Sequence, residues 1–452
     1  MKHRAIVAIP CVVFAFASGC DDNAGGGTVG NGQLKLAIIT PHDDRIQATF
    51  ADGFNAARAK AGQPPVTFEW NVHGTNEAVK IITDEFAAAG RRGPQAGINY
   101  DLFFGGGRPA FDALKQAGCT QAVKVSDAVL AGVPKTLNGI PIYDPAGHWY
   151  GAVLAAFGIV YNRDGLREKG IPEPKTWTDL ADPRLRGWVV LVDPSKSGSV
   201  AVCYEMILQK YGWEKGWGLL MRMAGNARDI LSSSRSVPRE VGQGSALAGP
   251  CIDFYGYAQV QADGPEHVGY INPAAATAFT PDPLCVLKNP PHRQLAEDFL
   301  AFVLSPAGQA LWALPDGHAD KPPGPPLYRL PIRPDVYGQF GDVLVVKDRP
   351  FAADAAFEFD PRKEEQRAKL LGPLFDAAFL KNKPSLDRAW AVIVEKGLPP
   401  DLLAEFESVP FAETEGFELA RAHASDSRRA IELDEQWFAF FRAKYEKIIA
   451  SN

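Results

Sequence analysis

The sequence predicts an α/β protein with two lobes and a helical C-terminal extension. The chain has 452 residues, more than one hydrophobic core usually serves. Apolar strand runs alternate with helical patterns, and one such run, Phe157 to Tyr161, is followed by a Pro-rich hinge at Ile171 to Pro174. That order is typical of a strand leaving one compact unit. We expect the following division: 34–154 and 270–330 in lobe one, 155–269 in lobe two, and 331–452 as a helical extension packed on lobe one.

The first 20 residues have the pattern of a lipoprotein signal. A basic start (2–4) and an apolar run (5–16) precede the order Ala17-Ser18-Gly19-Cys20, which is typical of a bacterial lipobox. The alternatives are a plain secretory signal and a transmembrane anchor, but the apolar run is too short to span a bilayer. We expect residues 1–19 to be removed, Cys20 to carry lipid, and the Gly-rich stretch 20–33 to be a flexible tether. The mature protein would then be exported and lipid-anchored, facing the periplasm or the cell exterior.

Two segments of lobe one follow predicted strands and carry candidate ligand-binding residues. His42 lies just beyond the buried run Leu34 to Thr40, where open α/β sheets bind ligands. The alternative for a lone histidine is a surface or capping residue. The strand Tyr100 to Phe104 leads into a glycine loop at a helix start, an arrangement that suits a small anion. The candidates in this loop are Gly106, Gly107 and Arg108.

Lobe two contains two hydroxyl-rich loops. The buried run Gly187 to Val192 delivers the first, Asp193 to Ser199, to a helix that begins near Val200. Backbone N–H groups, hydroxyls and a lysine converge there, which favours an anion. A single serine cluster is ordinarily a solvated loop, but a second one, Ser232 to Ser236, also precedes a helix. We therefore expect a shared anion pocket whose members are Ser195, Ser197, Gly198, Ser199, Ser233, Ser234 and Arg235.

The central block contains three motifs in a fixed order: Gly158-Ile159-Val160-Tyr161-Asn162, Pro174-Lys175-Thr176-Trp177, and Asp193-Pro194 with Ser197-Gly198. These motifs resemble those of the extracellular solute-binding proteins of ABC importers. The resemblance covers about residues 34–330 and is nearest to the ferric-iron-binding subgroup. It implies a type 2 periplasmic-binding fold with hinge crossings near 155–162 and 268–273. It also implies a monomer that closes on a small ligand and delivers it to a membrane permease.

The same resemblance implies ferric iron as the transported ligand. The stretch Gly244 to Tyr257 is similar to the strand and turn that carry the metal-binding tyrosines of the ferric subgroup, which also has a histidine near the position of His42. Phenolate oxygen suits Fe³⁺ because the metal lowers the tyrosine pKa. The chain departs from the subgroup's adjacent tyrosine pair, since Phe254 precedes Tyr255 and the second tyrosine stands two residues on. We expect Fe³⁺ with a synergistic anion on His42, Tyr255 and Tyr257; a small organic or phosphorylated anion is the alternative ligand.

Four cysteines lie beyond the leader: Cys119, Cys203, Cys251 and Cys285. Their spacings match no zinc pattern, and in an oxidising compartment they could form disulfides. On the predicted lobes, Cys203 with Cys251 and Cys119 with Cys285 would each stay within one lobe, although four cysteines allow three complete pairings. The extension carries no recognisable chemistry, and its last helix is expected to run from about Glu415 to Ile449.

Composition narrows the remaining classes. A net charge of −6 with both signs interspersed argues against a nucleic-acid partner. An exported hydrolase is the rival class, but the chain has no Gly-x-Ser-x-Gly elbow, no His-Glu-x-x-His and no paired Cys/His metal spacing. We therefore expect a binding protein and not an enzyme. A lipoprotein that contacts a partner through its helical extension is a third possibility.

Overall fold

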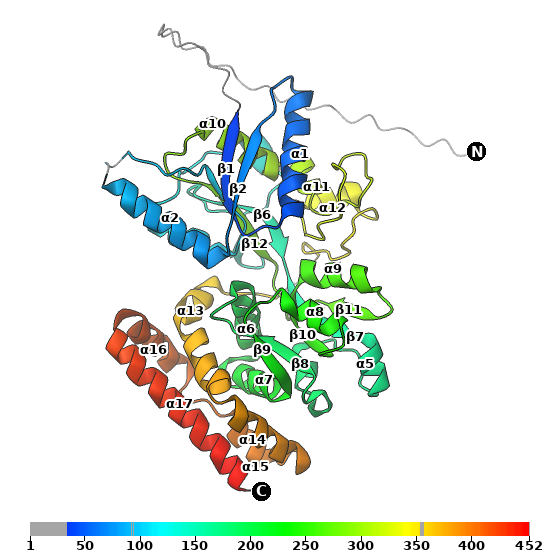
Figure 1. The fold of residues 1–452 in the computed structure, drawn as a ribbon, viewed down its shortest axis with the longest axis vertical. Coiled ribbons are helices and arrows are strands. Elements are labelled where there is room, and N and C mark those ends of the chain that lie inside the picture. The colour runs from blue at the N-terminus through cyan, green and yellow to red at the C-terminus, as the bar shows by residue number, and fades with distance from the viewer. Residues whose placement is uncertain (1–33, 92, 94, 353–356, 452) are drawn as a thin grey trace, which may run out of the picture.

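Two five-stranded sheets form the cores of two lobes, stacked along the long axis of the molecule (Figure 1). The computed structural model describes residues 34–451 apart from 92, 94 and 353–356. The predicted signal peptide, Cys20 and the tether 20–33 lie outside the described residues. In the part of the chain that the structure describes, no helix combines the length and hydrophobicity needed to cross a membrane.

Lobe one contains the first sheet. Its order is β2 (Thr67–Val72), β1 (Lys35–Thr40), β3 (Leu102–Phe104), β12 (Thr280–Val286) and β6 (Tyr150–Ala155). β1 is parallel to both of its neighbours and buries five of its six residues, whereas β12 is antiparallel to β3 and β6. A small antiparallel hairpin of β4 (Thr136–Leu137) and β5 (Ile140–Pro141) precedes β6 in the chain. The helices of this lobe are α1 (Asp44–Lys60), α2 (Thr75–Gly90), α3 (Arg108–Gln116), α4 (Asp127–Leu130), α10 (Arg293–Leu304), α11 (Pro306–Ala310) and α12 (Pro334–Phe340).

Lobe two contains the second sheet. Its order is β11 (Val268–Ile271), β7 (Phe157–Asn162), β10 (Ala248–Ile252), β8 (Val189–Val192) and β9 (Ala227–Leu231). β8 is parallel to β9 and β10, and β7 is antiparallel to β10 and β11. Its helices are α5 (Arg163–Glu168), α6 (Gly198–Tyr211), α7 (Trp213–Asn226), α8 (Ser236–Gly242) and α9 (Asp253–Asp263), with short 3₁₀ turns at Trp177–Ala181 and Pro183–Leu185.

Both predicted crossings between the lobes are confirmed. β6 belongs to the first sheet and β7 to the second, so the chain passes from one lobe to the other at Ala156. Asp253 fixes this point, because its backbone N–H donates to the Ala156 carbonyl and its Oδ2 accepts from the Ala156 N–H, each at 2.9 Å. The chain returns between β11 and β12, where Thr277 Oγ1 accepts from the Phe157 N–H and donates to the Phe157 carbonyl. The two crossings are therefore bonded to each other as one hinge.

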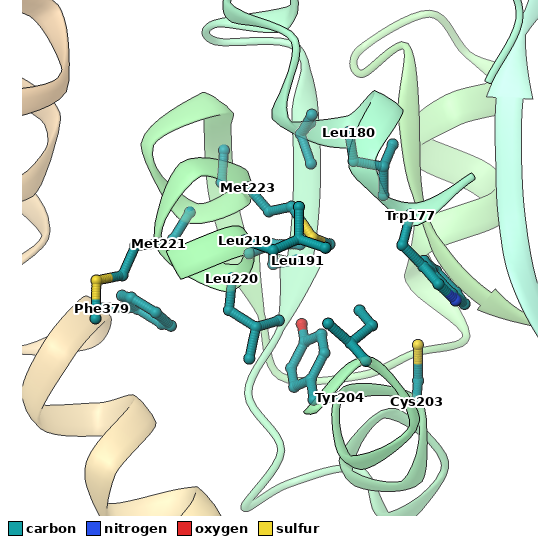
Figure 2. Packing of buried hydrophobic residues seen from close by; sticks show 14 of the residues in the cluster. Trp177, Leu180, Leu191, Cys203, Tyr204, Leu219, Leu220, Met221, Met223 and Phe379 are labelled. Atoms are coloured by element: carbon teal, nitrogen blue, oxygen red, sulfur yellow. The ribbon is translucent and has the colours of Figure 1, made fainter. Parts of the chain in front are cut away.

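The C-terminal helices pack on lobe two, so the prediction that the extension covers lobe one is wrong for most of its length. Within the extension, the buried apolar residues from Ile332 to Val346 belong to the cores of lobe one. The later helices share the core of lobe two, and Figure 2 shows Phe379 reaching the Met221 side of α7. These later elements are α13 (Pro361–Phe375), a π-helical turn (Asp376–Leu380), α14 (Lys383–Glu395), α15 (Pro400–Glu407), α16 (Glu413–Ser425) and α17 (Ser427–Ala450).

The physical reason for this position is helix α7. It is buried around nearly its whole circumference, including Trp213, Trp217 and Met221, and a helix that is apolar on all sides needs cover on all sides. The sheet covers one side, while α14, α15 and the π-helical turn cover the other.

Two further expectations differ from the structure. The helix predicted over Glu415 to Ile449 is two helices, because Asp426 leaves the helical conformation and its side chain accepts from the N–H groups of Arg428 and Arg429 as a new N-cap. The thiols of Cys119, Cys203, Cys251 and Cys285 are buried and free, so neither predicted disulfide is present.

We predict that Glu205→Gln gains stability relative to the wild type as the pH rises from about 5 to about 8. Burial raises the pKa of Glu205 from 4.5 to about 7, although Arg367 beside it opposes the rise. The folded state therefore binds this proton more tightly than the unfolded chain, and the stability from this group is complete below pH 4.5 and lost as the pH rises through 7. Glutamine stays neutral and keeps Oε1, which accepts from Arg367 Nη1 at 2.9 Å and Gln209 Nε2 at 2.8 Å.

Urea unfolding should show a gain approaching about 3 kcal/mol at the upper end of this range. Glu365→Gln is the matched control, because Glu365 lies on α13 and is exposed. The same pH dependence in wild type and Glu205→Gln would contradict the prediction.

Candidate functional site

The carboxyl ends of β1 and β3 place His42 next to the glycine loop. Thr40, the last residue of β1, donates from Oγ1 to the Phe104 carbonyl at 2.6 Å and accepts from the His42 N–H at 3.0 Å. The loop then folds over the imidazole, since a Cβ added to Gly105 would lie 2.4 Å from His42 Nε2. Gly105 also has a φ of +94°, which side chains disfavour. Only glycine fits this position.

His42 is buried and its ring nitrogens have no hydrogen-bond partner among the described residues. The ring packs edge-on against Phe104, with centroids 4.6 Å apart, and against Trp312 at 5.8 Å. Burial, followed by the charge of Arg329 and then that of Arg235, lowers the pKa of His42 to about 3, against the opposing effect of Asp43. The imidazole is therefore neutral at physiological pH, with one nitrogen able to donate and the other able to accept.

The two serine loops of lobe two meet, as the sequence predicts. Ser199 Oγ donates to Ser234 Oγ at 3.3 Å, and the hydroxyls of Ser197 and Ser199 are 3.1 Å apart. Ser197 and Ser234 are buried, whereas Ser195 and Gly198 are exposed. α6 begins at Gly198, so the cluster lies at the N-terminus of a 14-residue helix. Of the predicted members, Ser233 is partly exposed on the same loop as Ser234.

Arg235 joins the serine loops to the opposite lobe. Its Nε donates to the Tyr255 hydroxyl at 2.7 Å, and its Nη2 donates to the carbonyl of Pro41, next to His42, at 3.1 Å. Burial raises the pKa of Tyr255, although Arg235 and Arg329 oppose the rise. Tyr255 is thus a neutral phenol that accepts a charge-assisted hydrogen bond. This contact brings together His42, Arg235 and Tyr255 from both sides of the lobe boundary.

Tyr257 does not join Tyr255, contrary to the predicted metal set. The sequence predicts a strand and turn here, but both tyrosines lie on α9. Two residues on a helix are rotated by about 200°, so their side chains leave in nearly opposite directions. The Tyr257 hydroxyl donates to Asp348, which also accepts from Asn272 Nδ2 at 3.0 Å. Burial and then the Asp348 carboxylate raise the pKa of Tyr257, which disfavours a phenolate.

Arg108 is paired within the protein and is not the open anion donor that the sequence predicts. Its guanidinium bonds Asp112 of the same helix, and its Nη2 lies 2.8 Å from Glu364 Oε2 of α13. Gly106 and Gly107 precede it; Gly106 contacts Thr75 closely enough that a Cβ would lie 2.7 Å from Thr75 Cγ2.

Among the described residues, no group of three or more His, Cys, Asp or Glu side chains is arranged to hold a metal ion.

Sequence reasoning missed Arg329, the charged side chain that contributes most to the lowered pKa of His42. It is buried, forms an ion pair with Asp282, and lies over the Phe254 ring with Cζ 4.2 Å from the centroid. Arg329 stands in a Pro-rich stretch that breaks the strand and helix patterns. The only signal was an arginine between apolar residues, which by itself does not distinguish a buried from a surface position.

Comparison with known proteins places the chain in a family. Residues 98–323 match the model of the bacterial extracellular solute-binding proteins, which is half of the chain, and the protein belongs to this family. The phosphoglycerate transport regulatory protein PgtC of Salmonella typhimurium is 33% identical over 174 residues, covering 38% of this chain and 42% of PgtC. An uncharacterized protein of Haemophilus influenzae is 27% identical over 168 residues, covering 36% of this chain and 48% of its own. The match thus spans less than half the length of these relatives.

Solved structures show the same fold. The periplasmic binding protein AfuA of Actinobacillus pleuropneumoniae, with fructose-6-phosphate bound, has a TM-score of 0.58 at 17% identity, over 77% of this chain and 99% of AfuA. Iron-bound HitA of Pseudomonas aeruginosa has a TM-score of 0.54 at 21% identity, over 79% of this chain and 99% of HitA. The chain therefore has the two-lobed fold of periplasmic binding proteins, and the predicted family is confirmed. The family is one of extracellular proteins and AfuA is a periplasmic one, so this chain belongs to an exported family.

We predict that His42 stays neutral at about pH 5, where an unperturbed imidazole is mostly protonated. The reasons are its burial and the two guanidinium groups that lower its pKa. Side-chain ¹⁵N spectra of histidine-labelled protein should show a neutral ring for His42, assigned by its loss in His42→Asn. His267 is the internal control, because its hydrogen bond to Asp164 raises its pKa and keeps it protonated. A charged His42 ring at this pH would contradict the described burial.

Proposed function

We propose that this protein is the solute-binding component of an ABC importer and that its solute is a small organic anion carrying a phosphate or carboxylate group. It acts as a monomer, closes its two lobes on the solute and presents it to a membrane permease. The observation that carries the proposal is the contact of Arg235 with Tyr255 and Pro41, beside His42 and between the two lobes. A guanidinium at that boundary offers several donors to an anionic group.

The charges favour an anion over ferric iron. Arg235 and Arg329 both lie close enough to lower the pKa of His42, and Asp43 is the carboxylate that opposes them. Arg329 is paired with Asp282, so Arg235, which has no ion-pair partner among the described residues, is the guanidinium that repels a trivalent cation and attracts a phosphate or carboxylate. Tyr257, which the ferric hypothesis needs as a phenolate, donates to Asp348 instead. Ferric iron with a synergistic anion, held by His42 and Tyr255, is the alternative, and HitA is a relative of this fold that is iron-bound.

The remaining polar groups suit such an anion. The hydroxyls of Ser197, Ser199 and Ser234 gather at the N-terminus of α6, where backbone N–H groups and the helix dipole favour negative charge. Neutral His42 adds a donor without adding charge. PgtC is named for phosphoglycerate transport and AfuA was solved with fructose-6-phosphate, both phosphorylated organic anions. The ligand would gain its affinity from the closed arrangement, in which groups of both lobes reach it.

A thermal-shift series with three probes tests this proposal. We expect 3-phosphoglycerate or fructose 6-phosphate to raise the melting temperature and ferric citrate to leave it unchanged, because a ligand that binds only the folded state stabilises it by RT ln(1 + L/Kd), where L is the free ligand concentration. Arg235→Gln should weaken the binding by about thirtyfold, since a charged hydrogen bond is lost, and Tyr255→Phe by about fivefold. Arg239→Gln is the control, because Arg239 is 65% exposed on α8 and its nearest carboxylate is Glu240.

Coloured protein after addition of ferric citrate would contradict the proposal, above all if Tyr255→Phe removes the colour, because tyrosinate bound to ferric iron absorbs visible light. Equal affinities of Arg235→Gln and wild type for the binding probe would place the anion elsewhere.

The proposal includes a lipid anchor at Cys20, supported by the lipobox order Ala17-Ser18-Gly19-Cys20. We predict that Cys20→Ala, expressed in a bacterium that processes lipoproteins, leaves the membrane fraction or accumulates as unprocessed precursor. Fractionation and mass spectrometry of the N-terminus would measure this. Ser18→Thr is the control, because it changes the same segment and keeps the cysteine. Normal processing and membrane attachment of Cys20→Ala would exclude the anchor.

A further inference from the structure

Helix α13 connects the two lobes at a place away from the hinge. In Figure 1 it lies below α2, on the side opposite α9, and it belongs to lobe two by its packing. Its first turn nevertheless reaches lobe one, where Glu364 Oε2 is 2.8 Å from Arg108 Nη2. Both side chains are largely buried, at 12% and 15% exposed, so this ion pair is poorly screened by water.

Several contacts on both sides of Glu364 anchor α13 to lobe two. Just before the helix, the Asp360 N–H donates to Gln209 Oε1 at 2.7 Å and the Asp360 carbonyl accepts from Gln209 Nε2 at 3.0 Å. One turn beyond Glu364, Arg367 donates to buried Glu205 at 2.9 Å. Phe375 stacks on Tyr204, with ring centroids 5.3 Å apart. Glu364 is therefore carried by a helix that is fixed to α6 on both sides of it.

The segment before α13 adds an apolar contact with lobe one. Phe357 and Phe359 are buried in the same cluster as Ile140, a residue of the β4–β5 hairpin. The backbones also approach closely, because a Cβ added to Gly139 would lie 3.2 Å from the Phe359 carbonyl oxygen. The connection between α13 and lobe one thus has an ionic part and an apolar part.

The same helix touches a loop from each lobe. Arg108 directly follows Gly107, so Glu364 holds the end of the glycine loop. On the other lobe, a Cβ added to Gly372 would lie 3.5 Å from Ser195 Cβ, at the start of the serine loop. Glu364 and Gly372 are eight residues apart, or about 12 Å along the helix. The extension therefore spans both loops.

We propose that α13 is a latch that holds the lobes closed through the Glu364–Arg108 ion pair. The hinge lets the lobes separate, and the latch adds a contact that only the closed arrangement makes. A contact of this kind raises the population of the closed state before any solute binds. The solute then has to supply less free energy to close the lobes. The latch depends on the two-lobed fold and not on the identity of the solute.

Small-angle scattering of the ligand-free protein tests the latch. Glu364→Gln is the mildest break, because Arg108 keeps its bond to Asp112. We expect a larger radius of gyration for Glu364→Gln and for Arg108→Gln. The matched control is Glu365→Gln, the same change at the next, exposed residue of α13, which should leave the radius unchanged. Circular dichroism verifies that each variant is folded, and Arg108→Gln serves if Glu364→Gln is not.

The double variant separates a direct latch from two independent effects. If the ion pair is the closing contact, Glu364→Gln with Arg108→Gln should be no more open than either single variant, since the second change removes nothing further. A radius equal to that of the wild type in both single variants would overturn the proposal, and so would additive opening in the double variant. Because no solute is present, either result leaves the proposed ligand class unaffected.

Discussion

The arrangement of the C-terminal helices depends on helix α7, which is buried on nearly all sides. One side lies on the sheet of lobe two and the other needs an apolar cover, which the extension supplies through α14, α15 and residues such as Phe379. This cover fixes the direction of α13, because α13 leads into these helices and is bonded to α6 by Arg367. Glu364 therefore lies next to lobe one because the helices that follow α13 must cover α7 in lobe two.

Charge between the lobes is arranged around a neutral histidine. Arg329 is buried with Asp282, and Asp253 lies near it at the hinge, where burial raises its pKa to about 7. Asp253 also bonds Ala156 at the first crossing, so the charges near the site and the hinge share one residue. His42 remains uncharged because it is buried and because protonation would place a positive charge near the guanidinium groups of Arg329 and Arg235. Arg329 is thus paired with a carboxylate, whereas the exposed Arg235 has no ion-pair partner among the described residues.

Among the described residues, several contacts connect the lobes besides the Arg235–Pro41 hydrogen bond. The hinge strands lie in the centre, Asp348 takes hydrogen bonds from Tyr257 and Asn272 on the side of α9, and Glu364 pairs with Arg108 on the side of α13. Two of these connections depend on residues beyond the second crossing, Asp348 and Glu364. Segments that follow the two-lobed core in sequence thus return to its boundary, where they contact both lobes.

The amino-acid sequence by itself determined the local elements and their order. Apolar runs located several strands of both sheets, the run around Phe157 marked the crossing, and the hydroxyl patterns located two serine loops that meet in space. Hydrophobic periodicity and turn residues are local features, so a single sequence is enough to recognise them. Tertiary structure alone decided which lobe the extension covers, that Tyr255 and Tyr257 point apart on α9, and that Arg108 is paired with a residue 256 positions away. These outcomes depend on which apolar faces and charges meet across long sequence separations, and no local pattern records those meetings.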